Sequence, residues 1–391
     1  MNKRMPFVGF CSLIPLIALF VLAAMFVTPA HALAQTATPP VILGPYSSDT
    51  AIMPSSLDVD LRTLPGVNVT SSPTVLPLKR NPNVSSQPAA AAPPQPDQID
   101  SPTAMPSASS SFAGLDFSHY GGGWPPDTNG DVGPVYYIQM VNTAVGIFNK
   151  TTGSLAAAFT MNSFFNGTGG LCDANNMGDP VVVYDAQTDR WLVSDFAFAT
   201  NSSGNAIPPY YECIAVSKTG DPLTGGWWRY AYAVGTINSA TYMNDYPKFA
   251  VWPDAIYMSA NMFPDVATTA WGMVRVWALD KSRLYAGLSL SEVHFDLPSA
   301  YFTLLPAMWH GQLPPAGSPE YFTSIAAPNS LYLWKLKVDF NTPGNSTFTG
   351  PTTLAVNSFT ANATLAPQLN STEQVDLLND QIGRASCRER V

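Results

Sequence analysis

Acidic residues recur along the chain, each beside an apolar, aromatic-rich run that is typical of a β-strand. The four acidic signals are Gly130-Asp131, Gly178-Asp179, Asn244-Asp245 and Pro319-Glu320. If the runs are copies of one structural unit, Asp131, Asp179, Asp245 and Glu320 lie at one level around a common axis. Converging carboxylates raise one another's pKa or recruit a cation. These acids are therefore candidate ligand-binding residues. The alternative is that each caps backbone N–H groups at the start of its own strand.

A second candidate site is the segment Asp127-Thr-Asn129-Gly-Asp131. Side-chain oxygens at alternating positions of a loop can converge on Ca²⁺, which takes six to eight oxygen ligands. The segment departs from the EF-hand pattern, because Val132 stands where glycine is required and Ile138 where the bidentate glutamate belongs. Ca²⁺ is the cofactor that these residues suggest. The alternative is a cluster of Asx turns that shapes the start of a strand.

The elements that position these residues are predicted to be β-strands arranged in repeats. The apolar runs are Tyr136–Val141, Val181–Tyr184, Phe249–Trp252 and Tyr321–Ala326. Their spacing of roughly 50 to 75 residues is typical of all-β repeats, which form propeller blades.

Two of the repeats show four strands each, the number that makes one blade. The second repeat has Pro180–Tyr184, Arg190–Phe198, Glu212–Ser217 and Trp227–Val234. The third has Tyr246–Trp252, Ala255–Phe263, Gly272–Leu279 and Leu288–Phe295. The predicted fold is all-β, a fragment of about four propeller blades.

Composition divides the chain into four segments. Residues 1–34 are predicted to be a secretory signal peptide, since the apolar run Phe7–Val27 leads to A-x-A cleavage sites ending at Ala34. An uncleaved membrane anchor is the alternative. Residues 35–111 are rich in Pro, Ser and Ala and are predicted to be a disordered linker, or alternatively a propeptide. Residues 112–381 are predicted to form the blades, and residues 382–391 to be a translated sequencing adaptor.

Charge and cysteine content indicate an exported protein. The net charge of -9 becomes -13 without Lys3 and Arg4 of the signal and without the last ten residues, which carry three Arg and one Glu. An acidic chain argues against nucleic acid as a partner, and no membrane insertion is expected after signal cleavage. Cys172 and Cys213 remain from the four cysteines, and a disulfide between them is the expected state in an exported protein.

Several motifs together resemble those of a group of secreted bacterial propeller proteins. They are Pro125-Pro-Asp-Thr-Asn-Gly-Asp-Val-Gly-Pro134, Gly178-Asp-Pro-Val-Val-Val-Tyr-Asp185 and Asp245-Tyr-Pro-Lys-Phe249. The resemblance spans about residues 112–380. It implies a β-propeller of six or seven blades at the cell surface or outside the cell, and it implies no particular chemistry.

Two functions follow from these residues. The favoured one is a secreted, non-catalytic module that binds a polysaccharide or an extracellular protein, with Tyr210, Trp227 and Trp309 among the aromatic residues that could contact it. The alternative is a polysaccharide hydrolase or lyase that uses the carboxylates of Asp131, Asp179, Asp245 and Glu320, which would face the central channel of a propeller. Histidine-based catalysis is disfavoured, because His119, His294 and His310 lack metal-ligand spacing.

Overall fold

The computed structural model describes residues 41–48, 50–67, 74–75, 110–120, 123–124, 127–234, 236–237, 240–264, 272–359, 366–367 and 374–375. The predicted signal peptide, most of the predicted linker and the predicted adaptor segment lie outside these residues.

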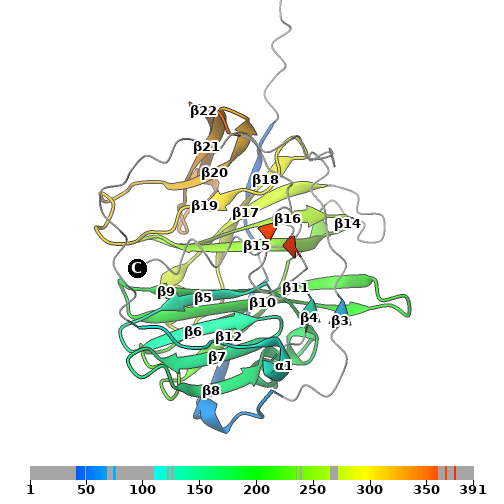
Figure 1. The fold of residues 1–391 in the computed structure, drawn as a ribbon. Coiled ribbons are helices and arrows are strands. Elements are labelled where there is room, and N and C mark those ends of the chain that lie inside the picture. Colours follow the sequence, from blue (N-terminus) through cyan, green and yellow to red (C-terminus); the bar gives the residue numbers. More distant parts are fainter. Residues whose placement is uncertain are drawn as a thin grey trace, which may run out of the picture. The chain divides into compact units, whose positions relative to one another are not determined.

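The described residues form an all-β structure built mainly from four antiparallel sheets, as predicted (Figure 1). Sheet I contains β5 (Asn129–Val132), β6 (Tyr136–Val141), β7 (Ala144–Asn149) and β8 (Leu155–Thr160). Sheet II contains β9 (Asn176–Asp185), β10 (Arg190–Thr200), β11 (Ala206–Ser217) and β12 (Trp227–Ala233). Sheet III contains β15 (Met243–Val251), β16 (Ile256–Phe263), β17 (Met273–Leu279) and β18 (Glu292–Pro298). Sheet IV contains β19 (Leu305–Pro306), β20 (Glu320–Ala327), β21 (Ser330–Lys337) and β22 (Thr347–Ala355).

The remaining elements are short. Two-residue strands are β3 (Thr74–Val75), β4 (Gly123–Trp124), β13 (Thr236–Ile237), β14 (Ala240–Thr241), β23 (Ala366–Pro367) and β24 (Gln374–Val375). The helices are α1 (Phe117–Tyr120), α2 (Met161–Phe165) and α3 (Lys281–Tyr285), with 3₁₀ turns η1 (Leu61–Thr63), η2 (Leu171–Asp173) and η3 (Pro343–Asn345). In the described part of the chain, none of these helices has the length and apolar character to span a bilayer.

The strand predictions for sheets II and III are confirmed, whereas sheets I and IV begin earlier than expected. Their first strands are β5 and β19, so the runs Tyr136–Val141 and Tyr321–Ala326 are second strands and not first ones. Both first strands are short, and β5 is made largely of Asn, Gly and Asp. Neither therefore produces the apolar run on which the prediction depended. The helix α3 lies in the connection between β17 and β18 of sheet III.

Successive sheets pack face to face through three hydrophobic cores. One core joins sheets I and II, a second joins II and III, and a third joins III and IV. Strand β9 shows the principle, since Val182 belongs to the first core while Val181 and Val183 belong to the second. Side chains alternate between the two faces of a strand, so a strand that is apolar throughout is buried on both sides.

The segment of residues 41–67, here called the N-terminal strap, crosses the outer edges of two sheets. Strand β1 (Leu43–Tyr46) pairs with β18, and β2 (Ser55–Leu57) pairs with β12. Leu61 is buried in the core between sheets I and II, and its N–H donates to the carbonyl of Leu223 at 2.9 Å. Burying one leucine side chain stabilises by roughly 1.5–3 kcal/mol. The prediction of a disordered linker is therefore wrong for this segment, because edge pairing and the packing of several apolar side chains against the cores offset its ordering entropy. These side chains are Ile42, Ile52, Leu57, Leu61 and Leu64.

The two end sheets of the array differ in how their outer faces are covered. On sheet I, the Phe112 ring lies 5.6 Å from that of Phe148, and the N–H of Leu115 donates to Gln139 at 2.7 Å. On sheet IV, Ile325 is 65% exposed and Leu354 is also exposed. Sheet IV therefore presents an apolar face that nothing covers among the described residues.

Candidate functional site

The start of each sheet is marked by a residue in the left-handed region of backbone conformation. The four residues are Asp127, Asp179, Tyr246 and Thr303, with φ between 42° and 58°. Each stands two residues before an equivalent ladder pair, namely Asn129↔Met140, Val181↔Ser194, Lys248↔Ser259 and Leu305↔Thr323. For a residue with a side chain this conformation costs about 1–2 kcal/mol. Its recurrence in all four sheets defines the structural repeat more sharply than the acidic signals do.

These registers show that the four predicted acids do not occupy equivalent positions. Asp179 is itself a left-handed residue, whereas Asp131 follows the left-handed Asp127 by four positions. Asp245 immediately precedes Tyr246, and Glu320 lies on β20, the second strand of its sheet. The prediction of one ring of acids at a common level is therefore wrong. The residue equivalent to Asp179 in sheet I is Asp127.

Asn129 and Asp131 join sheet I to the first strand of sheet II. They alternate along β5, so both side chains lie on the same face. The Asn129 Oδ1 accepts a hydrogen bond from the Val182 N–H at 2.8 Å, and the Asp131 Oδ2 accepts one from the Tyr184 N–H at 2.7 Å. The Asp131 Oδ1 accepts from the adjacent Val132 N–H. Bonds from an N–H to a carboxylate are among the stronger hydrogen bonds.

The next two junctions use the same device. The Asp179 Oδ2 of sheet II accepts from the N–H of Tyr246 in sheet III at 3.0 Å. The Asn261 Oδ1 of sheet III accepts from the N–H of Thr303 ahead of sheet IV at 2.9 Å, and its Nδ2 donates to the Thr303 Oγ1 at 2.9 Å. Both recipient amides belong to left-handed residues. The acids thus bind backbone amides, as the alternative interpretation held, but the amides belong to the following sheet and not to the same strand. Asn129, Asp131, Asp179 and Asn261 are called the latch residues below.

Sheet II also buries two acids that the motif analysis did not select. Asp195 is fully buried, and its Oδ1 accepts from the Gly178 N–H at 3.1 Å. Burial raises the pKa of the Asp195 carboxyl well above its usual range, and the nearby carboxylates of Glu212 and Asp179 raise it further. Glu212, also fully buried, accepts from the Asn244 Nδ2 of sheet III at 2.8 Å. A charged residue inside an apolar strand was the sequence signal for both.

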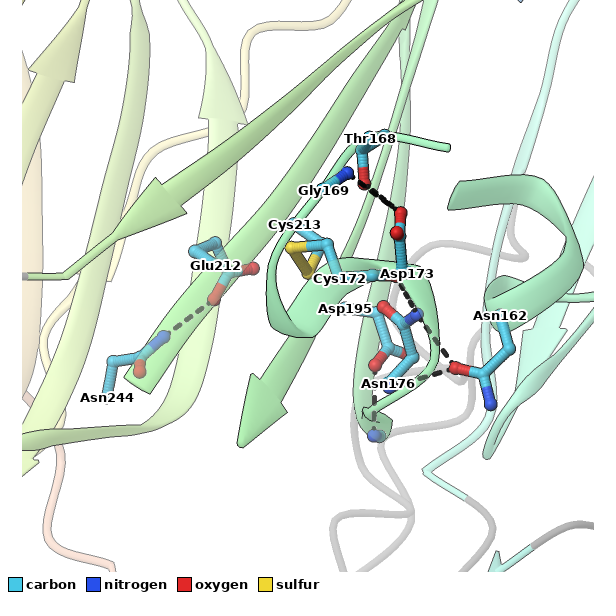
Figure 2. Close-up of a disulfide and its surroundings, with 11 residues drawn as sticks. Asn162, Thr168, Gly169, Cys172, Asp173, Asn176, Asp195, Glu212, Cys213 and Asn244 are labelled. Carbon is cyan, nitrogen blue, oxygen red and sulfur yellow. Dashed lines mark hydrogen bonds between the residues drawn. A yellow bond between two sulfur atoms is a disulfide. The ribbon is translucent and has the colours of Figure 1, made fainter. Parts of the chain in front are cut away.

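The disulfide lies beside these two acids (Figure 2). Cys172 and Cys213 are bonded as predicted, with their Cα atoms 5.7 Å apart. Asp195 pairs with Cys213 across β10 and β11, and Glu212 is the neighbour of Cys213 in the chain. Because adjacent residues of a strand face opposite sides of the sheet, Asp195 and Glu212 point to different faces. They do not converge on one ligand.

The predicted calcium ligands are engaged with protein groups in this structure. The Oδ2 of Asp127 accepts from the Asn142 Nδ2 at 2.6 Å, and the oxygens of Asn129 and Asp131 accept from β9 as described above. A cation would have to displace these donors. Throughout the described residues, no group of three or more His, Cys, Asp or Glu side chains is placed to hold a metal ion. The set does not fit calcium in this arrangement, so we expect Ca²⁺ not to bind here, which a calcium titration tests.

Glu320 lies buried in the interface between sheets III and IV. Its burial raises the pKa of the carboxyl to about 9, more than the amide N–H groups of Ala307 and Tyr321 lower it, and Asp254 raises it further. The group is therefore neutral at pH 7 and presents no charge to a ligand. Asp245, which immediately precedes the left-handed Tyr246, pairs with Asn261 in the ladder between β15 and β16.

Most of the aromatic candidates are packed. Tyr210 and Trp227 are buried, and the Trp227 indole N–H donates to the carbonyl of Pro222. Trp228 is partly exposed, with the Lys218 Nζ 3.8 Å from its ring centroid. The indole N–H of Trp309 donates to the carbonyl of Gln312. Tyr210 and Trp227 are therefore core residues, whereas Trp228 and Trp309 are half-buried.

Comparison with known proteins gives limited information. No protein-family model matches the sequence, and no curated protein matches it. A crystal structure of a putative exo-beta-1,3-galactanase from Bifidobacterium bifidum s17 aligns with 10% identity and a TM-score of 0.33, covering 67% of this chain and 97% of that one. An exo-beta-1,3-galactanase from Phanerochaete chrysosporium with beta-1,3-galactotriose aligns with 10% identity and a TM-score of 0.29, covering 57% and 58%. At these TM-scores the likeness assigns neither a fold family nor an activity to this chain.

Proposed function

We propose that this chain is an extracytoplasmic, non-catalytic β-propeller module that binds a polysaccharide or an extracellular protein. The proposal rests on the contacts of the acidic signals Asp131, Asp179 and Glu320, which are structural. Asp131 and Asp179 are buried and accept backbone N–H groups of the following sheet, and Glu320 is neutral and buried. Acids used in this way hold sheets together and are not exposed to a substrate. The disulfide supports an oxidising compartment.

The propeller assignment is supported by the repeated connection between sheets. Three successive junctions combine a shared hydrophobic core with a side chain that reaches the first strand of the next sheet. Each blade of a propeller needs a neighbour on both faces. The exposed Ile325 face of sheet IV fits a further blade, whereas the outer face of sheet I is covered by the residues around Phe112 and Leu115. A ring of six or seven blades stays a prediction.

The alternative is a polysaccharide hydrolase or lyase. One observation favours it, because a carboxyl with a raised pKa such as Asp195 is what a general acid requires. Glycoside hydrolysis also needs a second carboxylate within roughly 5–10 Å on the other side of the scissile bond. The carboxyl of Glu212 lies near Asp195 but faces the opposite side of sheet II, and both side chains are fully buried. These features favour a structural role for the pair.

Asp179→Asn separates the two functions. The amide keeps an oxygen that accepts the Tyr246 N–H but lacks a titratable carboxylate. We expect the variant to fold and to retain ligand binding on an array of polysaccharides and extracellular proteins. Mass spectrometry of the glycans after incubation should show no cleavage products from either protein. Glycan cleavage by the wild type would establish the hydrolase or lyase instead, and its loss in Asp179→Asn or in Asp195→Asn, at unchanged thermal stability, would identify the carboxyl responsible.

A further inference from the structure

A polar cleft lies where the N-terminal strap, the helix α3 and the turn after β21 meet. Its volume is about 320 Å³, and its lining includes Thr50, Ala51, Asp280, Arg283, Phe340 and Asn341. Ligand pockets in proteins range from roughly 300 to 1,000 Å³. The cleft is therefore large enough for a small ligand or for one or two units of a polymer.

Two walls of the cleft, the strap and the α3–β18 region, are fixed by hydrogen bonds. The Leu290 N–H donates to the Ile52 carbonyl at 2.9 Å, which attaches the strap to the residues after α3. The Asp280 N–H donates to the Ser291 carbonyl at 2.9 Å. The Arg283 side chain is held by Ser289, with Nε 3.0 Å from its carbonyl and Nη2 2.6 Å from its Oγ. A prearranged wall lowers the entropy that a ligand must lose on binding.

The chemistry of the lining matches a sugar ring. The Asp280 Oδ1 accepts from the Ser282 hydroxyl and the Arg283 N–H, which leaves its Oδ2 as the acceptor for a ligand. Arg283 offers Nη1 as a donor, because Nε and Nη2 bond Ser289, and the Asn341 amide supplies both a donor and an acceptor. Hydroxyl groups come from the serine and threonine side chains of the strap and of the α3–β18 connection. Phe340 and Leu290 add apolar surface. A sugar presents the same combination, with hydroxyl groups around its rim and C–H groups on its faces.

The charges of the lining residues indicate which class of sugar the cleft can bind. The lining contains one cationic and one anionic side chain, Arg283 and Asp280, so its formal charges cancel. An acidic or sulfated sugar would be attracted by Arg283 but repelled by Asp280. We propose that this cleft binds an uncharged sugar unit of a polysaccharide. The proposal rests on the proposed polysaccharide-binding function and adds the location of the site.

Two variants test the cleft without touching the latch. Ala51→Trp fills it with a bulky side chain at an exposed position, and Asn341→Ala removes one exposed amide. Ser203→Trp places the same bulk in the exposed turn between β10 and β11 and serves as the matched control. Binding is measured on immobilised laminarin, xyloglucan and galactomannan, and on heparin and alginate as charged probes, with thermal melting of every variant.

We expect the wild type to bind at least one of the three neutral polysaccharides. Ala51→Trp should weaken that binding about tenfold or more, equivalent to about 1.4 kcal/mol. Asn341→Ala should weaken it by a smaller factor, and Ser203→Trp should leave it unchanged. Neutral binding that survives both cleft variants would overturn the cleft while leaving the proposed function intact. Binding to heparin or alginate alone would overturn the uncharged class. No binding to any polysaccharide would remove the polysaccharide part of the proposed function itself.

Discussion

The latch at the junction of sheets III and IV can be tested by a single substitution, Asn261→Ala. The Asn261 side chain makes two hydrogen bonds to Thr303, one to its N–H and one to its Oγ1, both at 2.9 Å. Asn261 is buried and Thr303 is half-buried. Removing the amide leaves the Thr303 N–H without its acceptor in a residue that already has an unfavourable φ of 48°.

The expected cost follows from these contacts. An unsatisfied buried N–H costs about 1–3 kcal/mol, and a neutral side-chain hydrogen bond contributes about 1 kcal/mol. Water can reach the half-buried Thr303 in part, so the lower end of the range applies. We therefore expect Asn261→Ala to lower the free energy of unfolding by about 2 kcal/mol. Urea denaturation followed by tryptophan fluorescence measures this quantity.

Two controls distinguish the latch from a general effect of losing an asparagine. Thr303→Ala removes only the hydrogen bond to Oγ1, keeps the N–H bond to the Asn261 oxygen, and should retain more of the stability than Asn261→Ala. Asn357→Ala changes an exposed asparagine and should alter the free energy of unfolding by less than about 0.5 kcal/mol. A loss below about 0.5 kcal/mol in Asn261→Ala, or an equal loss in Thr303→Ala, would refute the assignment of the Asn261 oxygen as the latch.

Three further predictions concern the buried carboxyl, the disulfide and the calcium ligands. The folded-state pKa of Glu320 of about 9 lies above its ordinary value of 4.5, so the folded state holds a proton that the unfolded state releases. The contribution of this proton to stability is complete below pH 4.5 and is lost as the pH rises to about 9. Glu320→Gln should therefore flatten the curve of unfolding free energy against pH in this range. A slope equal to that of the wild type would contradict the raised pKa of Glu320. Cys213→Ser should lower the free energy of unfolding by on the order of 3–4 kcal/mol, because the disulfide joins residues 41 apart. Calorimetry of the variant and of the reduced protein measures this decrease. Addition of about 1 mM Ca²⁺ should leave the Tm unchanged. A rise in the Tm of the wild type with Ca²⁺ that is absent in Asp127→Asn would instead show that calcium binds at this segment.

The sequence predicted the repeated sheets because their evidence is local. The second half of strand β9, Pro180–Tyr184, is an unbroken apolar run, and the turns that bound the strand are rich in Asp and Gly. The even number of cysteines in an exported chain predicted the disulfide for a similarly simple reason. By contrast, β19 contains only Leu305 and Pro306, and no pattern of two residues identifies a strand. It is positioned by its ladder to β20 and by the left-handed Thr303 before it.

The roles of the acids could not be predicted, because their partners are distant in sequence. Asp131 binds an amide 53 residues away and Asp179 one 67 residues away. Backbone amides carry no residue-specific signal, so nothing in the sequence marks Tyr184 or Tyr246 as the recipient. The same limit applies to the strap, since pairing at a sheet edge is made by the backbone. Composition alone therefore described the segment around Leu43–Tyr46 as disordered.

The polar side chains that hold the sheets together are engaged with neighbouring strands or sheets, so a ligand site has to be sought elsewhere. The latch side chains bond the following sheet, and Asp195 and Glu212 are buried between sheets. The cleft at α3 differs from these buried positions, because Thr50, Ala51 and Asn341 in its lining are exposed. A backbone hydrogen bond joins the strap to Leu290, and the Arg283 side chain is held by Ser289. The strap contributes one wall of the cleft. Its pairing with sheets II and III therefore both protects two sheet edges and completes the site proposed for an uncharged sugar.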